Sequence, residues 1–207
     1  MLVKVFGSAV FGVEATTITV EVNTEKGIGY HLVGLPDSAI KESSFRIAAA
    51  LKNNSYQFPG KKIIVNMAPA DLRKEGSAYD LTIAVGILAA SSQITSKEIE
   101  NYIIMGELSL DGTLQPIKGA LSIAIKAKEE GFKGVIIPIQ NVKEAAIVED
   151  LDVYGVSNVT EVIEFFEGKG NLEPTRIDTT EEFSKTLNFP EYDFADVKGH
   201  KNQNIIY

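Results

Sequence analysis

The stretch that decides the fold is VGLPDSAIKESSFRIAAALKNNSYQFPGKKIIVNMAPADLRKEGSAYDLTIAVGILAA, residues 33–90. Within it, residues 37–53 begin with an aspartate suited to capping a helix and then carry apolar residues at helical spacing. The short apolar run 61–68 predicts a strand, and the polar residues 69–77 predict a loop. Residues 78–92 are apolar on nearly every face, which predicts a helix buried on most sides. These elements together indicate layers of helix and sheet around one core.

The residues before this stretch are expected to form strands. VEATTITVEV (13–22) alternates between apolar and polar residues and is rich in Val and Thr, as is typical of a strand with one face in water. GIGYHLVGL (27–35) follows after the turn-like NTEKG. The spacing predicts that these two strands pair as an antiparallel hairpin.

The residues after it alternate between strands and helices. IIMGELSL (103–110) predicts a strand that ends at an Asp111-Gly112 turn. Further expected elements are helix 120–130, strand 134–138, helix 140–149, strand 151–156 and helix 159–167. Strands followed by alternating helices and strands predict an α+β or mixed α/β layer fold.

Composition excludes several classes of function. The chain has 207 residues, a net charge of −8 and no cysteine, so thiol nucleophiles, disulfides and cysteine metal sites are absent. A generic DNA-binding domain usually carries the opposite charge, so DNA contact is expected only through local basic patches. The two histidines, His31 and His200, lack the spacing of a zinc site, and no apolar run is long enough to span a membrane.

Three stretches carry a resemblance to a known family. Residues 33–90 resemble the hallmark block of the ComM/YifB family of magnesium-chelatase-related AAA+ ATPases, and GELSLDGTLQPIKGAL (106–121) is similar to a segment of Lon-type protease domains. FADVKGHKNQ near the C-terminus resembles the start of that family's AAA+ module. The resemblance implies an α+β fold of the Lon-protease-like, ribosomal protein S5 domain 2-like type, with helices on a mixed sheet. It also implies a domain over 1–168, a linker over 169–193 and the start of a truncated AAA+ module over 194–207.

The resemblance implies an accessory domain rather than an enzyme. The whole protein is expected to be a cytoplasmic, hexameric ATPase that remodels DNA, with branch migration during DNA uptake and competence as its expected role. The phosphate-binding motif GxxxxGK[ST] is absent from this sequence, so ATP and Mg are expected only in the missing module, and no cofactor is expected here. The expected partners are that module, sister subunits and DNA, with no membrane.

Protease chemistry is expected to be lost. Lon-like proteases use a Ser–Lys dyad, and the resemblance places the serine position on Ala78 and the lysine position on Leu121 or Ile123. Neither a methyl group nor an aliphatic side chain can supply a nucleophile or a base. The alternative is a Lon-like peptidase with a displaced dyad of Ser77 and Lys118.

Basic side chains mark a possible interface or DNA contact. Arg73 and Lys74 lie in the loop before the buried helix, where Asp71 and Asp80 are expected to position the arginine. Lys61 and Lys62 could add a small basic patch. The alternative for all four is ordinary solvated surface charge.

Glu107 lies in an otherwise apolar strand and is expected to be structural, either facing water or buried with a partner. A chelatase component for tetrapyrrole synthesis is a third hypothesis. It is disfavoured because pigment chelatase ATPase subunits begin with the AAA+ module, so the chelatase label is expected to belong to the missing module.

Overall fold

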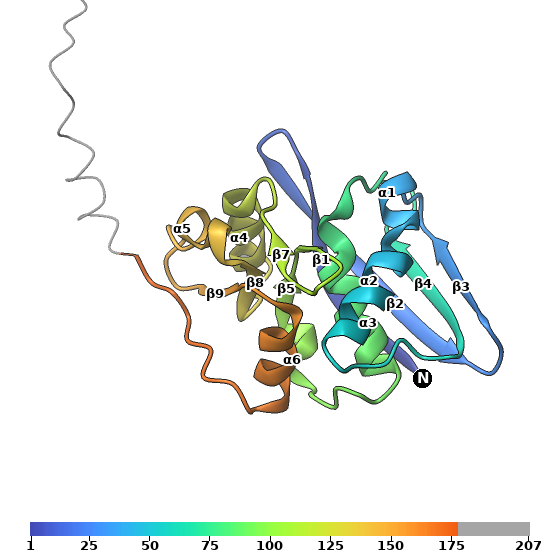
Figure 1. Cartoon of the computed structure of the whole chain (residues 1–207). Coiled ribbons are helices and arrows are strands. Elements are labelled where there is room, and N and C mark those ends of the chain that lie inside the picture. The colour runs from blue at the N-terminus through green and yellow to red at the C-terminus, as the bar shows by residue number, and fades with distance from the viewer. Residues whose placement is uncertain (178–207) are drawn as a thin grey trace, which may run out of the picture. The chain divides into compact units, whose positions relative to one another are not determined.

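A seven-stranded mixed sheet in the order β3-β4-β2-β1-β5-β8-β9 runs through residues 1–177, the part of the chain that the computed structural model describes (Figure 1). The sheet strands are β1 (Leu2–Phe11), β2 (Glu14–Glu25), β3 (Gly29–Val33), β4 (Lys62–Ala68), β5 (Tyr102–Ile104), β8 (Gly134–Pro138) and β9 (Asp152–Val156), and a separate hairpin joins β6 (Glu107–Leu108) to β7 (Leu114–Gln115). The helices are α1 (Ser38–Lys41), α2 (Ser43–Asn53), α3 (Asp80–Ala90), α4 (Ala120–Glu129), α5 (Val142–Ala145) and α6 (Val159–Glu167), with short 3-10 turns η1 (Ser77–Tyr79), η2 (Glu98–Asn101) and η3 (Ile139–Asn141). The expected α+β class with a mixed sheet is confirmed.

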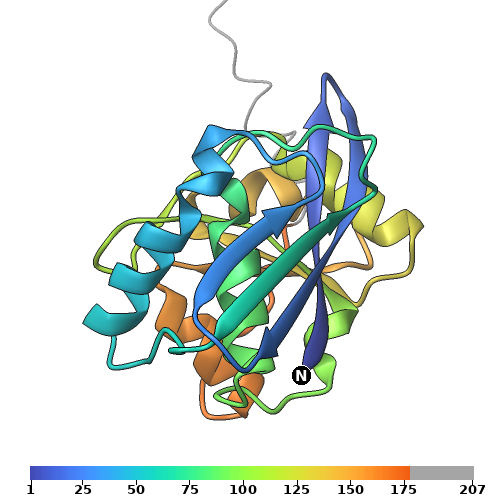
Figure 2. The same ribbon diagram turned by 90° about the vertical axis from the view of Figure 1, so that its right-hand side faces the viewer.

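The predicted hairpin between 13–22 and 27–35 is wrong. Strand β2 pairs along its length with β1, from Leu2↔Asn23 to Phe11↔Glu14, and no separate strand was assigned to residues 2–11 from the sequence. Strand β4 lies between β2 and β3, antiparallel to the first and parallel to the second (Figure 2). Strand β4 therefore has a hydrogen-bonded neighbour on each of its edges, an arrangement that a local turn signal cannot reveal.

The predicted helix 37–53 is divided at Glu42 into α1 and α2. Its start is confirmed, because the Asp37 side chain accepts a hydrogen bond from the Ile40 amide at 2.9 Å. Near the break, the guanidinium of Arg46 donates to the carbonyl of Ala39 at 2.8 Å. The Arg46 side chain therefore satisfies a main-chain carbonyl of α1 where α1 and α2 meet.

Helix α3 forms the centre of the core, and every residue from Asp80 to Ala90 is buried. It lies against β1 and β2, and the approach is so close that a Cβ at Gly86 would lie 2.6 Å from Cγ2 of Val22. The prediction of a helix buried on most sides is confirmed. Helix α4 packs near the outer end of β1 and β2, where the Ser122 hydroxyl donates to the Val13 carbonyl at 2.9 Å.

The predicted strand 103–110 is two short strands, β5 and β6, because the chain turns away from the sheet after Ile104. The Met105 amide still donates to Ile136 of β8 at 3.0 Å, and the next amide, of Gly106, donates to Ala78 before α3. Within residues 1–177, β5 therefore pairs with β1 only at Phe6↔Ile103.

Two residues of the predicted linker 169–193 contact the edge strand β9. The Thr175 amide donates to the Val153 carbonyl of β9 at 2.8 Å, and Arg176 lies 3.4 Å from the Asp152 carboxylate. The remainder of the predicted linker, and the expected AAA+ start at 194–207, lie outside the described residues. Among the described helices, none combines the length and the apolar character that a membrane crossing requires.

Candidate functional site

A cleft of about 390 Å³ lies beside the outer end of β1. The loop before α3, the β6 strand and the segment that leads into α4 complete its walls. Its lining includes β1 residues 8–11 together with Arg73, Glu75, Ser77, Ala78, Met105, Glu107, Ile117, Lys118 and Ile123. Segments far apart in the sequence, and both halves of the expected protease-like site, therefore meet in one place.

The two positions at which the resemblance places a protease dyad carry apolar side chains. Ala78 lines the cleft, and so does Ile123, which is 1% exposed. Leu121 is not among the lining residues, and its amide donates instead to the Glu144 carboxylate at 3.0 Å. Of the two alternatives for the lysine position, Ile123 lines the cleft and Leu121 does not.

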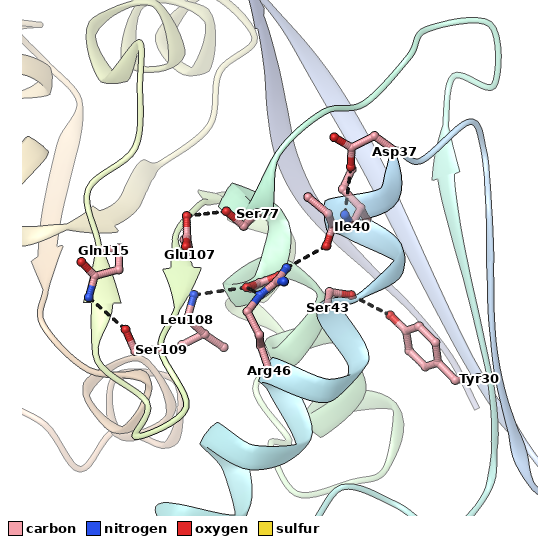
Figure 3. Close-up of polar contacts among 12 residues, drawn as sticks. Tyr30, Asp37, Ile40, Ser43, Arg46, Ser77, Glu107, Leu108, Ser109 and Gln115 are labelled. Atoms are coloured by element: carbon pink, nitrogen blue, oxygen red, sulfur yellow. Dashed lines mark hydrogen bonds and ion pairs between the residues drawn. The ribbon is translucent and has the colours of Figure 1, made fainter.

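Ser77 and Lys118 line the same cleft, but no hydrogen bond joins them within residues 1–177. The Ser77 hydroxyl instead donates a short hydrogen bond to the Glu107 carboxylate (Figure 3). A lysine that activates a serine must lie within hydrogen-bond reach of its hydroxyl. Glu107 is half-buried and has a partner, as expected, although its partner is a serine from another segment.

Near Ser77 and Glu107, an ion pair between Arg46 and the buried Asp80 fixes the start of α3. The Arg46 guanidinium contacts both Asp80 oxygens, at 2.6 and 2.9 Å, and the Leu108 amide donates to the same carboxylate at 3.3 Å (Figure 3). Burial raises the pKa of the Asp80 carboxyl, while Arg46 acts in the opposite direction. The expectation that Asp80 positions Arg73 is wrong. The signal was in the sequence, since an aspartate that opens a wholly apolar helix needs a cationic partner.

Lys74 does not lie on the surface, and its expected role as an interface or DNA contact is wrong. Its side chain is 0% exposed, and its ammonium group donates to the carbonyls of Gly34, at 2.9 Å, and of Pro69. Its main chain also bonds to Leu35 and Asp37. Burial lowers the pKa of this ammonium group. Lys74 therefore fastens the turn after β3 to the loop before α3.

Of the other basic candidates, Arg73 and Lys61 are exposed and Lys62 is half-buried, and the three do not form one patch. Arg73, whose side chain is 72% exposed, pairs with Glu75 at 3.0 Å, and Lys62 pairs with Glu25 at 2.7 Å. Lys61 is exposed beside Lys62 at the start of β4, whereas Arg73 follows the end of that strand. The structure therefore separates the lysine pair from the arginine.

Comparison with known proteins identifies the family. A family model described as "Subunit ChlI of Mg-chelatase" matches residues 20–141, and the chain belongs to this family. The match lies within the described domain, so the expectation that the chelatase label belongs to a missing module is wrong.

Several relatives are similar over most of the chain. "Uncharacterized protein YifB" of Escherichia coli is 40% identical over 194 residues, which cover 93% of this chain and 37% of the relative. "Competence protein ComM" of Haemophilus influenzae is 40% identical over 172 residues, which cover 83% and 34%. A "Lon protease" of Lachnoclostridium phytofermentans is 30% identical over 173 residues, which cover 77% and 21%. The chain thus spans about a third of the length of the YifB and ComM relatives.

Proposed function

We propose that residues 1–168 are a non-catalytic accessory domain of a ComM-like AAA+ ATPase that remodels DNA. The proposal includes no peptidase and no nucleotide chemistry in this domain, with ATP and Mg bound by a separate AAA+ module. The whole protein would work as a cytoplasmic hexameric ring, as the resemblance to ComM implies.

The observation that carries the proposal is the composition of the cleft. The chain is 40% identical to a competence protein and 30% identical to a Lon protease, and the positions to which the resemblance assigns the dyad, Ala78 and Leu121 or Ile123, carry apolar side chains. A Lon-like fold without a nucleophile and base at those positions supports a scaffold role, because one fold commonly serves several functions.

Contact with DNA is proposed through exposed cations, since Lys74 is buried. Arg73, Lys61 and Lys62 are the remaining candidates, and two of them already pair with carboxylates. In an acidic chain, six copies of a weak basic site would have to act together for useful affinity. Charge reversal at Lys61 and Lys62 should therefore weaken DNA binding by the ring much more than binding by the 207-residue chain.

The test uses the protein encoded by the complete gene. Its reading frame should contain GxxxxGK[ST] after Tyr207, and the purified protein should hydrolyse ATP and migrate branched DNA. Deletion of residues 1–168 should reduce branch migration more than ATP hydrolysis. The proposal fails if no such motif follows, or if the deletion leaves branch migration unchanged.

A second candidate is a Lon-like peptidase with the displaced dyad of Ser77 and Lys118. The observation that favours it is that both residues line one cleft. Against it, the Ser77 hydroxyl donates to Glu107, which directs its proton toward a carboxylate and not toward a lysine.

A serine-reactive fluorophosphonate probe separates the two functions. We expect no labelling of the wild-type chain and no difference from the Ser77→Ala variant. Labelling that is lost in both Ser77→Ala and Lys118→Met, but kept in the surface variant Lys61→Met, would establish the peptidase and overturn the accessory reading.

A further inference from the structure

Strand β9 forms one edge of the seven-stranded sheet, and the chain that follows α6 returns to it (Figure 1). Helix α6 is capped by Gly168, which adopts φ +68° and whose amide donates to the Phe165 carbonyl at 3.1 Å. This left-handed cap turns the chain back. The Thr175 amide then donates to the Val153 carbonyl at 2.8 Å, in an antiparallel bridge between these two residues.

Residues 172–176, here called the strap, have the features of an outermost strand. Because Thr175 faces β9, the neighbouring Pro174 directs its nitrogen away from β9, where a missing donor costs no hydrogen bond. Glu173 and Arg176 are exposed on either side of this pair. Proline and charged side chains are typical of sheet edges, since they prevent a further strand from adding. The strap therefore closes the sheet at β9.

The polar attachment of the strap is small. Within residues 1–177 it consists of the Thr175 hydrogen bond and an ion pair between Arg176 and Asp152 at 3.4 Å. The arginine side chain is 79% exposed, so water screens the pair and its contribution is slight. On its other side, β9 pairs with β8 through five successive residue pairs. The strap can therefore leave β9 while β9 stays in the sheet.

We propose that the strap is releasable, and that its docking on β9 sets the point at which the following chain leaves the domain. In the docked state the chain leaves after Arg176, and in the released state it leaves after Gly168 at the end of α6. The eight residues 169–176 span at most about 26–29 Å when extended, so release changes the reach of the connection by up to that length. The inference goes beyond the proposed function and does not rest on it, because it concerns only contacts within the described domain.

The first test is amide exchange in the ¹⁵N-labelled 207-residue chain. The Thr175 amide reports docking directly, because its acceptor belongs to β9. We expect it to exchange about 10–100 times more slowly than the same sequence in an unfolded chain, and at least about tenfold faster than the amide of Ile136, which lies in β8 between two strands. An unprotected Thr175 amide would mean that the strap does not dock, and protection equal to that of Ile136 would mean a permanent strand. Either result overturns the inference.

A pair of charge variants tests the ion pair. Asp152→Asn removes the partner of Arg176 and should speed exchange of the Thr175 amide about two- to fivefold. The matched control is Asp150→Asn, which removes a nearby carboxylate that pairs with Lys128 at 3.8 Å and should leave the Thr175 rate unchanged. Equal effects of the two variants would contradict the assigned contact.

A second pair of variants tests release itself. Thr175→Pro removes the donor to Val153, whereas Thr175→Ala keeps it. Trypsin should cut Thr175→Pro after Arg176 about tenfold faster than Thr175→Ala, with both rates divided by those of short peptides that carry the same substitution. The Tm values of the two variants should agree within about 2 °C, since release leaves the core intact. Equal cleavage rates, or a lower Tm for Thr175→Pro, would show that the strap is not a releasable element.

Discussion

The buried pair of Arg46 and Asp80 gives the sharpest test of how this domain is held together. Arg46→Met removes the cation and leaves the Asp80 carboxylate, whose side chain is 1% exposed, with the Leu108 amide as its one remaining donor among the described residues. Removal of one partner from a buried pair typically costs about 3–5 kcal/mol. Because Arg46 itself is 21% exposed, water can reach part of the site, and we expect the lower half of that range, about 3–4 kcal/mol.

The measurement is equilibrium unfolding in urea, followed by circular dichroism, with the slope of the free energy against urea as a check that the transition is unchanged. Thermal unfolding should show a decrease in Tm of roughly 6–16 °C, from about 2–4 °C for each kcal/mol in a domain of this size. The second variant, Arg46→Met with Asp80→Asn, keeps an acceptor for the Leu108 amide but removes the charge. It should recover at least about half of the lost stability, since the unpaired charge is the main penalty.

The pH dependence of the stability provides an independent test, because its direction is fixed by the Asp80 pKa. A carboxyl whose pKa is raised in the folded state contributes stability that is present below the pKa of the unfolded chain and is lost as the pH rises through the folded-state pKa. Removal of Arg46 raises the Asp80 pKa further, so the deficit of Arg46→Met should be smaller at pH 5 than at pH 7.5. A cost below about 1 kcal/mol at neutral pH with an unchanged urea slope, or a deficit that grows on acidification, would refute the reasoning.

Three further predictions concern single positions. Lys74→Met should lower the free energy of unfolding by about 2–4 kcal/mol, because two buried carbonyls lose their donor. Arg73→Ala, which removes an exposed ion pair, should lower it by less than about 0.5 kcal/mol. Urea unfolding of both variants therefore compares a buried lysine with an exposed arginine next to it in the sequence. Asp37→Ala should cost about 1–2 kcal/mol through loss of the helix cap, and Asp37→Asn should restore most of it; equal stability of the two variants would contradict a capping role. Gly119→Ala should lower Tm, because the residue has φ +74° and its Cβ would lie 2.8 Å from a Val10 methyl group, and an unchanged Tm would show that the approach to β1 is looser than described.

Much of the secondary structure could be predicted from local pattern. Helix 159–167 and strand 134–138 have the expected bounds, and α3 is buried along its whole length, because its sequence offers no polar face. The cap at Asp37 was also predicted, since capping depends on residues three apart in the chain. Such features are set by neighbours in the sequence and need no knowledge of the fold.

The missed and wrong elements depend on partners that are distant in the sequence. Strand β1 contains no regular alternation of polar residues because both of its faces are covered along much of its length, and pairing with β2 makes it a strand. The position of β4 between β2 and β3 likewise follows from burial of its two edges. A turn-like NTEKG between two strands did not determine which strands pair.

The same division holds for the candidate site. The sequence by itself determined that Ala78 lacks a nucleophile, that the charge of the chain is −8 and that thiol chemistry is absent, because these are properties of residue type. Only the tertiary structure decided that Lys74 is buried, that Ser77 meets Glu107, and that the end of β1 borders the cleft. The physical reason is that burial, hydrogen-bond partners and free edges arise where distant segments meet, and a linear pattern records only the side chains that each segment brings.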